Sequence, residues 1–286
     1  MKELNFLVSE YAEQILQINK KTRPYTIAAA IGSIILTIGL LWLFTYSKEP
    51  SRYFDDKFAF VVASPLLFLG VYFFRILEKA EKEFWIKFSE KNDGVYETFG
   101  NPLDEQAIMF RQGHTRSVQH SVMFGEGNNQ TKIFRYSFSI GAGKSKTTYT
   151  YTVFTQTFER SVPHLYLNYR RDGYGVSIGD SISLPSEFEK EFDISIPKGY
   201  HIEALQIFTP EILATILDLG IKVDIELVGN QIYFFIRQER SFGMNFKKHL
   251  ELLEEKHRAV SVLMRLLKPR LDRFNFAKIG DLPHTL

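Results

Sequence analysis

The chain has 286 residues, which is enough for one large domain or for a membrane anchor joined to one soluble domain. Its 35 Lys and Arg against 33 Asp and Glu leave a net charge of +2, so the charge balance gives no reason to expect nucleic acid as a partner. Cysteine is absent, which excludes disulfides, thiolate zinc sites and cysteine nucleophiles.

Two apolar runs near the N-terminus predict a two-helix transmembrane hairpin at residues 24–76. Residues 24–47 carry no charge. At about 1.5 Å of rise per residue, such a helix crosses a hydrocarbon core of roughly 30 Å. We expect one span at about 25–46 and a second at 58–76, which Pro65 would kink.

The flanks of these runs predict their orientation. Trp42 and Tyr46, near the end of the first run, are candidate membrane-interface residues because aromatic side chains gather at that depth. Seven Lys and Arg flank the runs on the side of the chain termini, whereas three lie in the loop between the runs. The positive-inside rule then places both termini in the cytoplasm, with residues 1–23 as an amphipathic cytosolic helix.

After the second run, residues 77–92 continue as a charged juxtamembrane helix. Phe84, Trp85 and Phe88 are candidate membrane-interface residues on this helix, which would then lie in the headgroup region. The alternative is a stalk that packs on the soluble domain, and both interpretations stay open. Asn92-Asp93-Gly94 breaks the helix, so residues 93–286 are expected to form one cytosolic domain.

The stretch GAGKSKTT, residues 141–148, resembles a phosphate-binding loop but lies between two alternating strands. A phosphate-binding loop of this type requires a glycine five positions before Gly143, where Phe138 stands, and a helix after it, where a threonine-rich strand follows. We therefore predict a hairpin turn here and no nucleotide site.

The stretch GVSIG, residues 175–179, matches the nucleophile elbow of serine hydrolases around Ser177. No helix follows it, and no repeated strand–helix units surround it, so a hydrolase is only the third interpretation. The histidines show no metal-binding spacing. We expect no catalytic residue, metal or cofactor, and no enzyme.

The C-terminal third predicts the rest of the domain. A helix is expected from Thr209-Pro210 to Gly220, then a hairpin over 222–237 with Gly229-Asn230 at its turn. A long helix at about 244–268 would end before Pro269. Together with the strands, these elements predict a membrane-anchored α+β fold with a strand-rich antiparallel cytosolic domain and a long C-terminal helix.

Apolar residues recur along this last helix in steps of four and three, as in a heptad seam. This seam packs either on the domain's own sheet or on a protein partner, including a second copy of the chain. Its members are Phe246, Leu250, Leu253, His257, Val260, Met264 and Leu267.

Residues 184–236 resemble the bacterial membrane-protein family catalogued as domain of unknown function 3137. The resemblance rests on Phe188 and Phe192, on residues 204–217 with the helix start at Thr209-Pro210, and on the hairpin that ends at Tyr233-Phe234. It implies two spans followed by a cytosolic domain at the bacterial inner membrane, and it implies no catalytic residue.

From these features we expect a non-catalytic integral membrane protein whose cytosolic domain binds a protein partner or organises a membrane assembly. The alternative is a lipid-binding module, in which a curved sheet capped by the C-terminal helix resembles a pleckstrin-like barrel and contacts anionic headgroups. The expected partners are thus the lipid bilayer and a protein, with no nucleic acid.

Overall fold

The computed structural model describes residues 4–6, separate positions between 24 and 42, residue 75, and residues 78–171, 174–238 and 246–273. The chain divides into two compact units, residues 7–84 and residues 1–6 with 85–286. In the first unit, the described positions between 24 and 42 are helical, and so are residues 78–84.

The structure contradicts the predicted transmembrane hairpin. Among the described residues, no helix is both long and apolar enough to cross a membrane. The longest described helix, α6 (Phe246–Arg273), has 12 charged residues among its 28. The predicted span at 25–46 is described only at separate positions, and the span at 58–76 lies outside the described residues except for Arg75. The expectation of an integral inner-membrane protein with both termini cytoplasmic is corrected on this finding.

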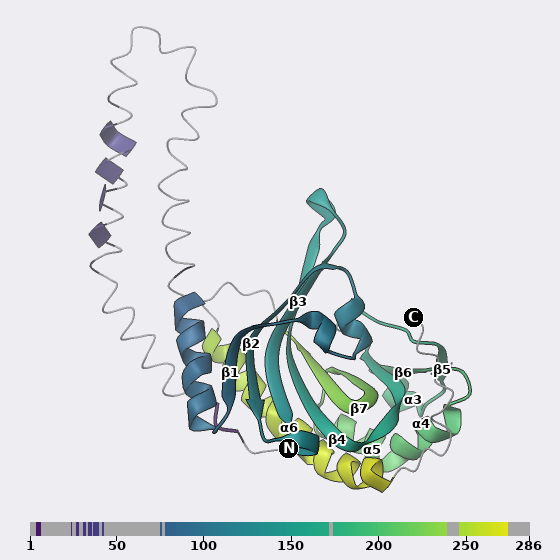
Figure 1. Ribbon diagram of the computed structural model, residues 1–286. Helices are drawn as coiled ribbons and strands as arrows, with labels where there is room; N and C mark the ends of the chain where they lie inside the picture. Colours follow the sequence, from purple (N-terminus) through teal and green to yellow (C-terminus); the bar gives the residue numbers. More distant parts are fainter. Residues whose placement is uncertain are drawn as a thin grey trace. The chain divides into compact units, whose positions relative to one another are not determined.

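The second unit is built on an antiparallel sheet, and the described residues form seven strands of it. The strand order is β1-β2-β3-β4-β6-β5, and β7 pairs with β4. Figure 1 shows β1 to β4 side by side in one curved layer. The strands are β1 (Val95–Gly100), β2 (His114–Phe124), β3 (Thr131–Ile140), β4 (Thr147–Tyr169), β5 (Asp180–Ile182), β6 (Phe192–Ile196) and β7 (Asp224–Arg237).

Short helices connect these strands, and α6 follows β7. Helix α5 starts at the predicted Thr209-Pro210 and ends before Gly220, as expected. The short helices are η2 (Pro102–Asp104), η3 (Ile108–Arg111), η4 (Gly127–Asn129), η5 (Gly143–Ser145), α3 (Ser186–Glu189), α4 (His201–Ile207) and α5 (Pro210–Asp218).

Strand β7 corrects one predicted turn, because Gly229-Asn230 lies inside a single continuous strand. Gly229 has φ +58°, in the left-handed region that glycine tolerates. Opposite it, β4 is irregular: Thr157 pairs with Gln231, whereas Val162 already pairs with Gly229. The extra residues of β4 form a bulge at this point. The glycine therefore bends the strand and does not reverse it.

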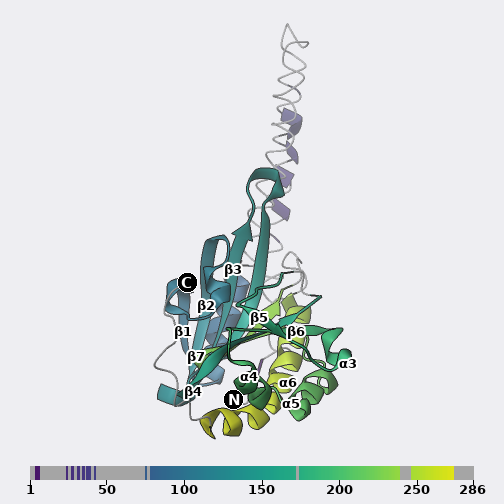
Figure 2. The ribbon, with the colours of Figure 1, turned by 90° about the vertical axis from the view of Figure 1, so that its right-hand side faces the viewer.

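One face of the sheet packs on α6, which lies across β4 (Figures 1 and 2). The helix does not end before Pro269 as predicted, because it continues to Arg273. A proline inside a helix forfeits one backbone hydrogen bond. Leu271, in the turn that follows Pro269, is fully buried, so its packing offsets that loss.

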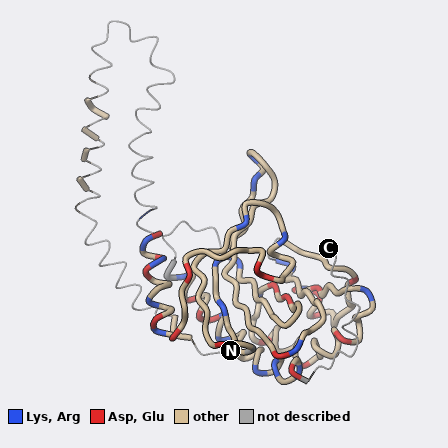
Figure 3. Tube along the Cα trace, in the orientation of Figure 1, with Lys and Arg blue, Asp and Glu red and all other residues tan. Residues whose placement is uncertain are grey.

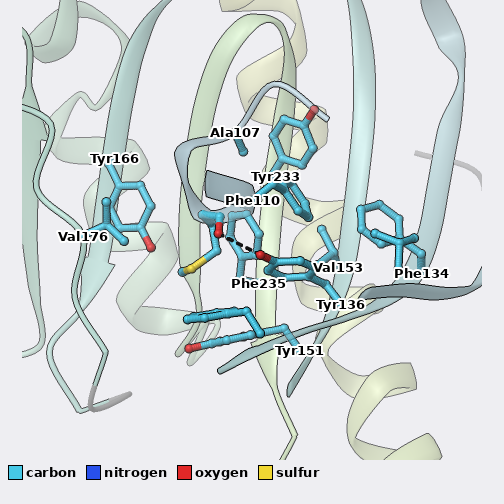
Figure 4. Packing of buried hydrophobic residues seen from close by; sticks show 13 residues of the cluster. Ala107, Phe110, Phe134, Tyr136, Tyr151, Val153, Tyr166, Val176, Tyr233 and Phe235 are labelled. Atoms are coloured by element: carbon cyan, nitrogen blue, oxygen red, sulfur yellow. Dashed lines mark hydrogen bonds between the residues drawn. The ribbon is translucent and has the colours of Figure 1, made fainter. Parts of the chain in front are cut away.

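The other face of the sheet is covered by the segment that contains η3. Phe110 of η3 lies 4.6 Å, centre to centre, from the ring of Tyr136 and 5.6 Å from that of Tyr233. Figure 4 shows these rings packed in one cluster with Phe235 and Tyr151, and the hydroxyl of Tyr136 donates to the carbonyl of Met109. Strands β3, β4 and β7 supply the aromatic rings, as their alternating sequence predicted.

The stretch GAGKSKTT is a turn between two paired strands, as predicted. Strands β3 and β4 pair without interruption from Thr131 opposite Gln156 to Ile140 opposite Thr147. The tip is the one-turn helix η5, and this end of the hairpin projects from the sheet in both ribbon views (Figures 1 and 2). A strand, β4, follows the turn at the place where a phosphate-binding loop of this type requires a helix.

Two glycines of this region test the packing of the hairpin. Gly113 and Gly143 have φ +58° and +57°, so alanine at either position costs about 1 to 2 kcal/mol of backbone strain. A Cβ at Gly113 would stand 2.4 Å from the Ser139 carbonyl oxygen, whereas at Gly143 it would meet open space. We expect Gly113→Ala to lower the free energy of unfolding by about 3 kcal/mol or more, and Gly143→Ala by the strain alone. If chemical denaturation showed that both variants lose the same unfolding free energy, the close packing at Gly113 would be contradicted.

His249 lies where α6 meets the sheet. Its Nε2 lies 3.2 Å from Thr152 Oγ1 and 3.1 Å from Gln238 Nε2. Burial, with a smaller effect of Arg135, lowers the pKa of His249 from 6.5 to about 4. The unfolded chain thus binds this proton at higher pH than the folded chain, so stability is present above pH 6.5 and falls as the pH falls toward 4.

Between pH 7 and pH 5, this histidine should cost about 2 kcal/mol of unfolding free energy. In urea denaturation, His249→Gln should lose that part of the pH dependence. His201→Gln, at an exposed position of α4, controls for the removal of a histidine as such. If the unfolding free energy of His249→Gln depended on pH as strongly as that of the wild-type chain, His249 would not be the source of this pH dependence.

Candidate functional site

Ser177 lies in the segment before β5, in a stretch without regular secondary structure. Its Oγ is 3.3 Å from Ser195 Oγ and 3.4 Å from the Gly179 carbonyl oxygen. Ser195 Oγ also accepts a hydrogen bond from the N–H of Ile178 at 2.8 Å. A serine nucleophile needs an adjacent general base, and neither partner of the Ser177 hydroxyl is one. These contacts fasten the segment to β6.

The predicted seam of α6 faces the protein's own interior. Its members from Leu250 to Leu267 are all buried, and His257, the polar member, is 3% exposed. The His257 ring lies 5.6 Å from that of Phe154 in β4 and 5.5 Å from that of Phe6. The side chain of Phe246 lies outside the described residues. The described part of the seam is therefore core of this unit.

The candidate membrane-interface residues lie in different surroundings. Trp42 is exposed, and Tyr46 lies outside the described residues. Phe84 is buried, as are Trp85 and Phe88 of the second unit. The rings of Trp85 and Phe88 meet edge to face at 5.4 Å, and Phe88 meets Phe124 of β2 at 5.8 Å. Trp85 and Phe88 thus belong to the core of the second unit.

A cluster of buried carboxylates is the feature that the sequence analysis missed. Asp224 and Glu226 occupy alternate positions of β7, so their side chains share one face, and both are fully buried. Asp224 accepts from the Tyr166 hydroxyl at 3.0 Å and from the Tyr169 N–H at 2.7 Å. The available signal was an Asp-x-Glu pair at the start of a strand that is mostly apolar, since a carboxylate buried there requires hydrogen-bond donors.

Glu226 connects this cluster to the segment that covers the sheet. Its Oε1 accepts from the N–H of Ile108 at 2.6 Å and lies 2.8 Å from His164 Nε2. Ile108 is the first residue of η3, where backbone N–H groups lack partners inside the helix. The carboxylate thus holds the N-terminus of η3 against the sheet.

Two tyrosines complete the cluster as hydrogen-bond donors. The Tyr233 hydroxyl lies 3.2 Å from Glu105 Oε2, just before η3. Burial, followed by the nearby carboxylates, raises the pKa of Tyr166 and of Tyr233 well above the ordinary value of a tyrosine. Both hydroxyls therefore stay protonated and can donate. In the described residues, no three His, Asp or Glu side chains gather as a metal site would require. The cluster anchors η3.

On the surface of the second unit, β1 and the short helix after it carry three large exposed apolar side chains. Val95 is 62% exposed and Phe99 is 71% exposed, and Leu103 of η2, just after the strand, is 61% exposed. Along β1, exposed residues alternate with half-buried ones, so Val95, Glu97 and Phe99 share one side. β1 pairs with β2, and no described strand pairs with its other edge.

Comparisons with known proteins do not identify a family for this chain. No family model matches the chain, and no curated protein matches it, so the resemblance over residues 184–236 stays a prediction. One solved structure that matches is the crystal structure of the mycobacterial trehalose monomycolate transport factor A, TtfA. The identity is 10%, over 65% of this chain and 93% of that chain, with a TM-score of 0.42. At that level of similarity, nothing about this chain follows from the match.

Proposed function

We propose that this chain is a non-catalytic binding protein that takes up an extended segment of a protein partner along β1. The observation that carries the proposal is the edge of β1 with which no described strand pairs, together with the exposed Val95 and Phe99 beside it. An edge strand presents unpaired N–H and C=O groups, and an added strand can pair with them.

The composition of β1 supports this assignment. Proteins usually protect an edge strand with lysine, proline or a bulge, because an open edge promotes aggregation. The sequence of β1, VYETFG, contains none of these residues, and its pairing with β2 runs at constant register. Its one charge is Glu97. Large exposed apolar side chains at such an edge are typical of a surface that a partner covers.

The alternation along β1 indicates the chemistry of that partner. In an added strand, the side chains directly opposite Val95, Glu97 and Phe99 would lie about 4.5 to 5.5 Å away, measured between Cβ atoms. Apolar residues suit the two outer positions, and lysine or arginine suits the position opposite Glu97. The expected segment reads apolar-x-basic-x-apolar.

The geometry of the rest of the unit favours β1 over the surfaces considered from the sequence. The described seam of α6 is buried, so it offers no face to a helical partner. Ser177 contacts a second serine and a carbonyl oxygen, which favours binding over hydrolysis.

A reversal of charge tests the proposal. Labelled peptides with the pattern Val-Thr-Lys-Thr-Val and Val-Thr-Glu-Thr-Val would be titrated against the full chain by fluorescence anisotropy. We expect the protein to bind the lysine peptide about fivefold more tightly than the glutamate peptide. Glu97→Lys should reverse that order, and Phe99→Asp should weaken the binding of both peptides.

The matched control is Glu187→Lys, which makes the same charge change at an exposed position of α3. It should leave the preference for the lysine peptide unchanged. If neither peptide binds, or if Glu97→Lys and Glu187→Lys behave alike, β1 is not the binding edge.

A further inference from the structure

A second surface, independent of β1, is the projecting end of the β3–β4 hairpin. We call residues 139–148 the β3–β4 arm. All six residues from Gly141 to Lys146 are exposed, and the arm stands away from the sheet in Figures 1 and 2. The pairing of β4 with β7 ends at Tyr151 opposite Arg237, whereas its pairing with β3 continues to Thr147. The arm projects because β3 and β4 extend past β7.

The charge on this hairpin is segregated. The chain has 33 acidic residues in 286, or one in about nine, yet the 32 residues from 127 to 158 contain none. Figure 3 shows basic residues, here Lys144 and Lys146, but no Asp or Glu along the arm. Within the described part of the chain, no ion pair involves Lys144 or Lys146 at its tip. The chain's overall charge of +2 therefore conceals a local cationic tip.

The base of the arm is stiffened by aromatic packing. The ring of Phe138 stacks on that of Tyr149 at 5.5 Å and meets Tyr174 at 5.1 Å. The guanidinium of Arg237 lies over the Tyr149 ring at 5.2 Å. His114 Nε2 lies 2.7 Å from the Gly141 carbonyl oxygen, at the start of the turn. These contacts fix the base of the arm to the sheet, and both lysines at its tip are exposed.

We propose that the β3–β4 arm binds the anionic headgroups of a phospholipid surface through Lys144 and Lys146. A negatively charged bilayer surface attracts lysines without a complementary shape, since its headgroups are mobile in the plane. The tip sequence Gly-Ala-Gly-Lys-Ser-Lys has no large apolar side chain, so it contacts headgroups and does not insert into hydrocarbon.

The small size of the tip disfavours the other anionic partners. A specific protein interface buries about 800 Å² on each side, which is more than a six-residue turn offers. DNA-binding proteins typically contact roughly six to ten phosphates, and two lysines supply far fewer contacts. A single phosphate would need free backbone N–H groups, but those of Ser145 and Lys146 already donate to Ala142 and Gly143.

Vesicle flotation with the full chain tests the proposal. The measured quantity is the ratio of binding to vesicles with about one third phosphatidylglycerol over binding to pure phosphatidylcholine vesicles. The ratio removes any adsorption that does not depend on charge. We expect a ratio well above one that falls toward one in about 0.5 M salt. Lys144→Gln with Lys146→Gln should lower it about thirtyfold.

The control is Lys198→Gln with Lys222→Gln, which removes the same charge at exposed positions away from the arm and should keep the ratio. An unchanged ratio in the arm variant, or no preference in the wild-type chain, overturns the proposal. Poly-glutamate, titrated in parallel, tests whether the arm binds an acidic protein segment instead of lipid. If the arm substitutions weaken its binding but not that of vesicles, the arm binds an acidic protein segment, and the lipid proposal is wrong.

Discussion

The length of β4 is the constraint on which the second unit depends. Its 23 residues pair with β3 along the first half, with β6 along the end, and with β7 along most of the strand. A strand of that length stays in register with two sets of neighbours only if it can bend, and the bulge opposite Gly229 provides the bend. The sheet then curves, with α6 on one face and η3 on the other.

Inside this curved sheet, apolar side chains fill the space, but they cannot satisfy the backbone groups that become buried there. Backbone N–H groups of the segment that covers the sheet need acceptors, and Glu226 provides one to Ile108. Glu105 and Asp224 accept from the hydroxyls of Tyr233 and Tyr166. Hydrogen bonds from donors in other parts of the chain thereby offset the cost of burying these carboxylates. The cluster specifies where the covering segment sits, which an apolar contact would leave less defined.

The same architecture explains why both proposed surfaces lie at the edges of the sheet. β1 ends the strand order on one side, so no described strand pairs with its outer edge. The β3–β4 arm exists because β7 stops at Arg237 while β4 and its other neighbour, β3, continue. The faces of the sheet, by contrast, are used for folding, and the heptad seam of α6 is buried against one of them. Both proposed binding surfaces, β1 and the β3–β4 arm, therefore lie outside the two buried faces of the sheet.

The sequence by itself determined the elements whose signals are local. Alternating aromatic residues predicted the β3–β4 pair, and Thr209-Pro210 with Gly220 bounded α5, because side-chain period and capping act within a few residues. Only the tertiary structure decided the rest. Gly229-Asn230 is a bend because β4 carries extra residues opposite it, and Pro269 lies within α6 because Leu271 is buried beyond it. Asp224 and Glu226 found donors from β4 and η3, which are distant in the chain. Those outcomes depend on which segments meet, and no local pattern encodes that.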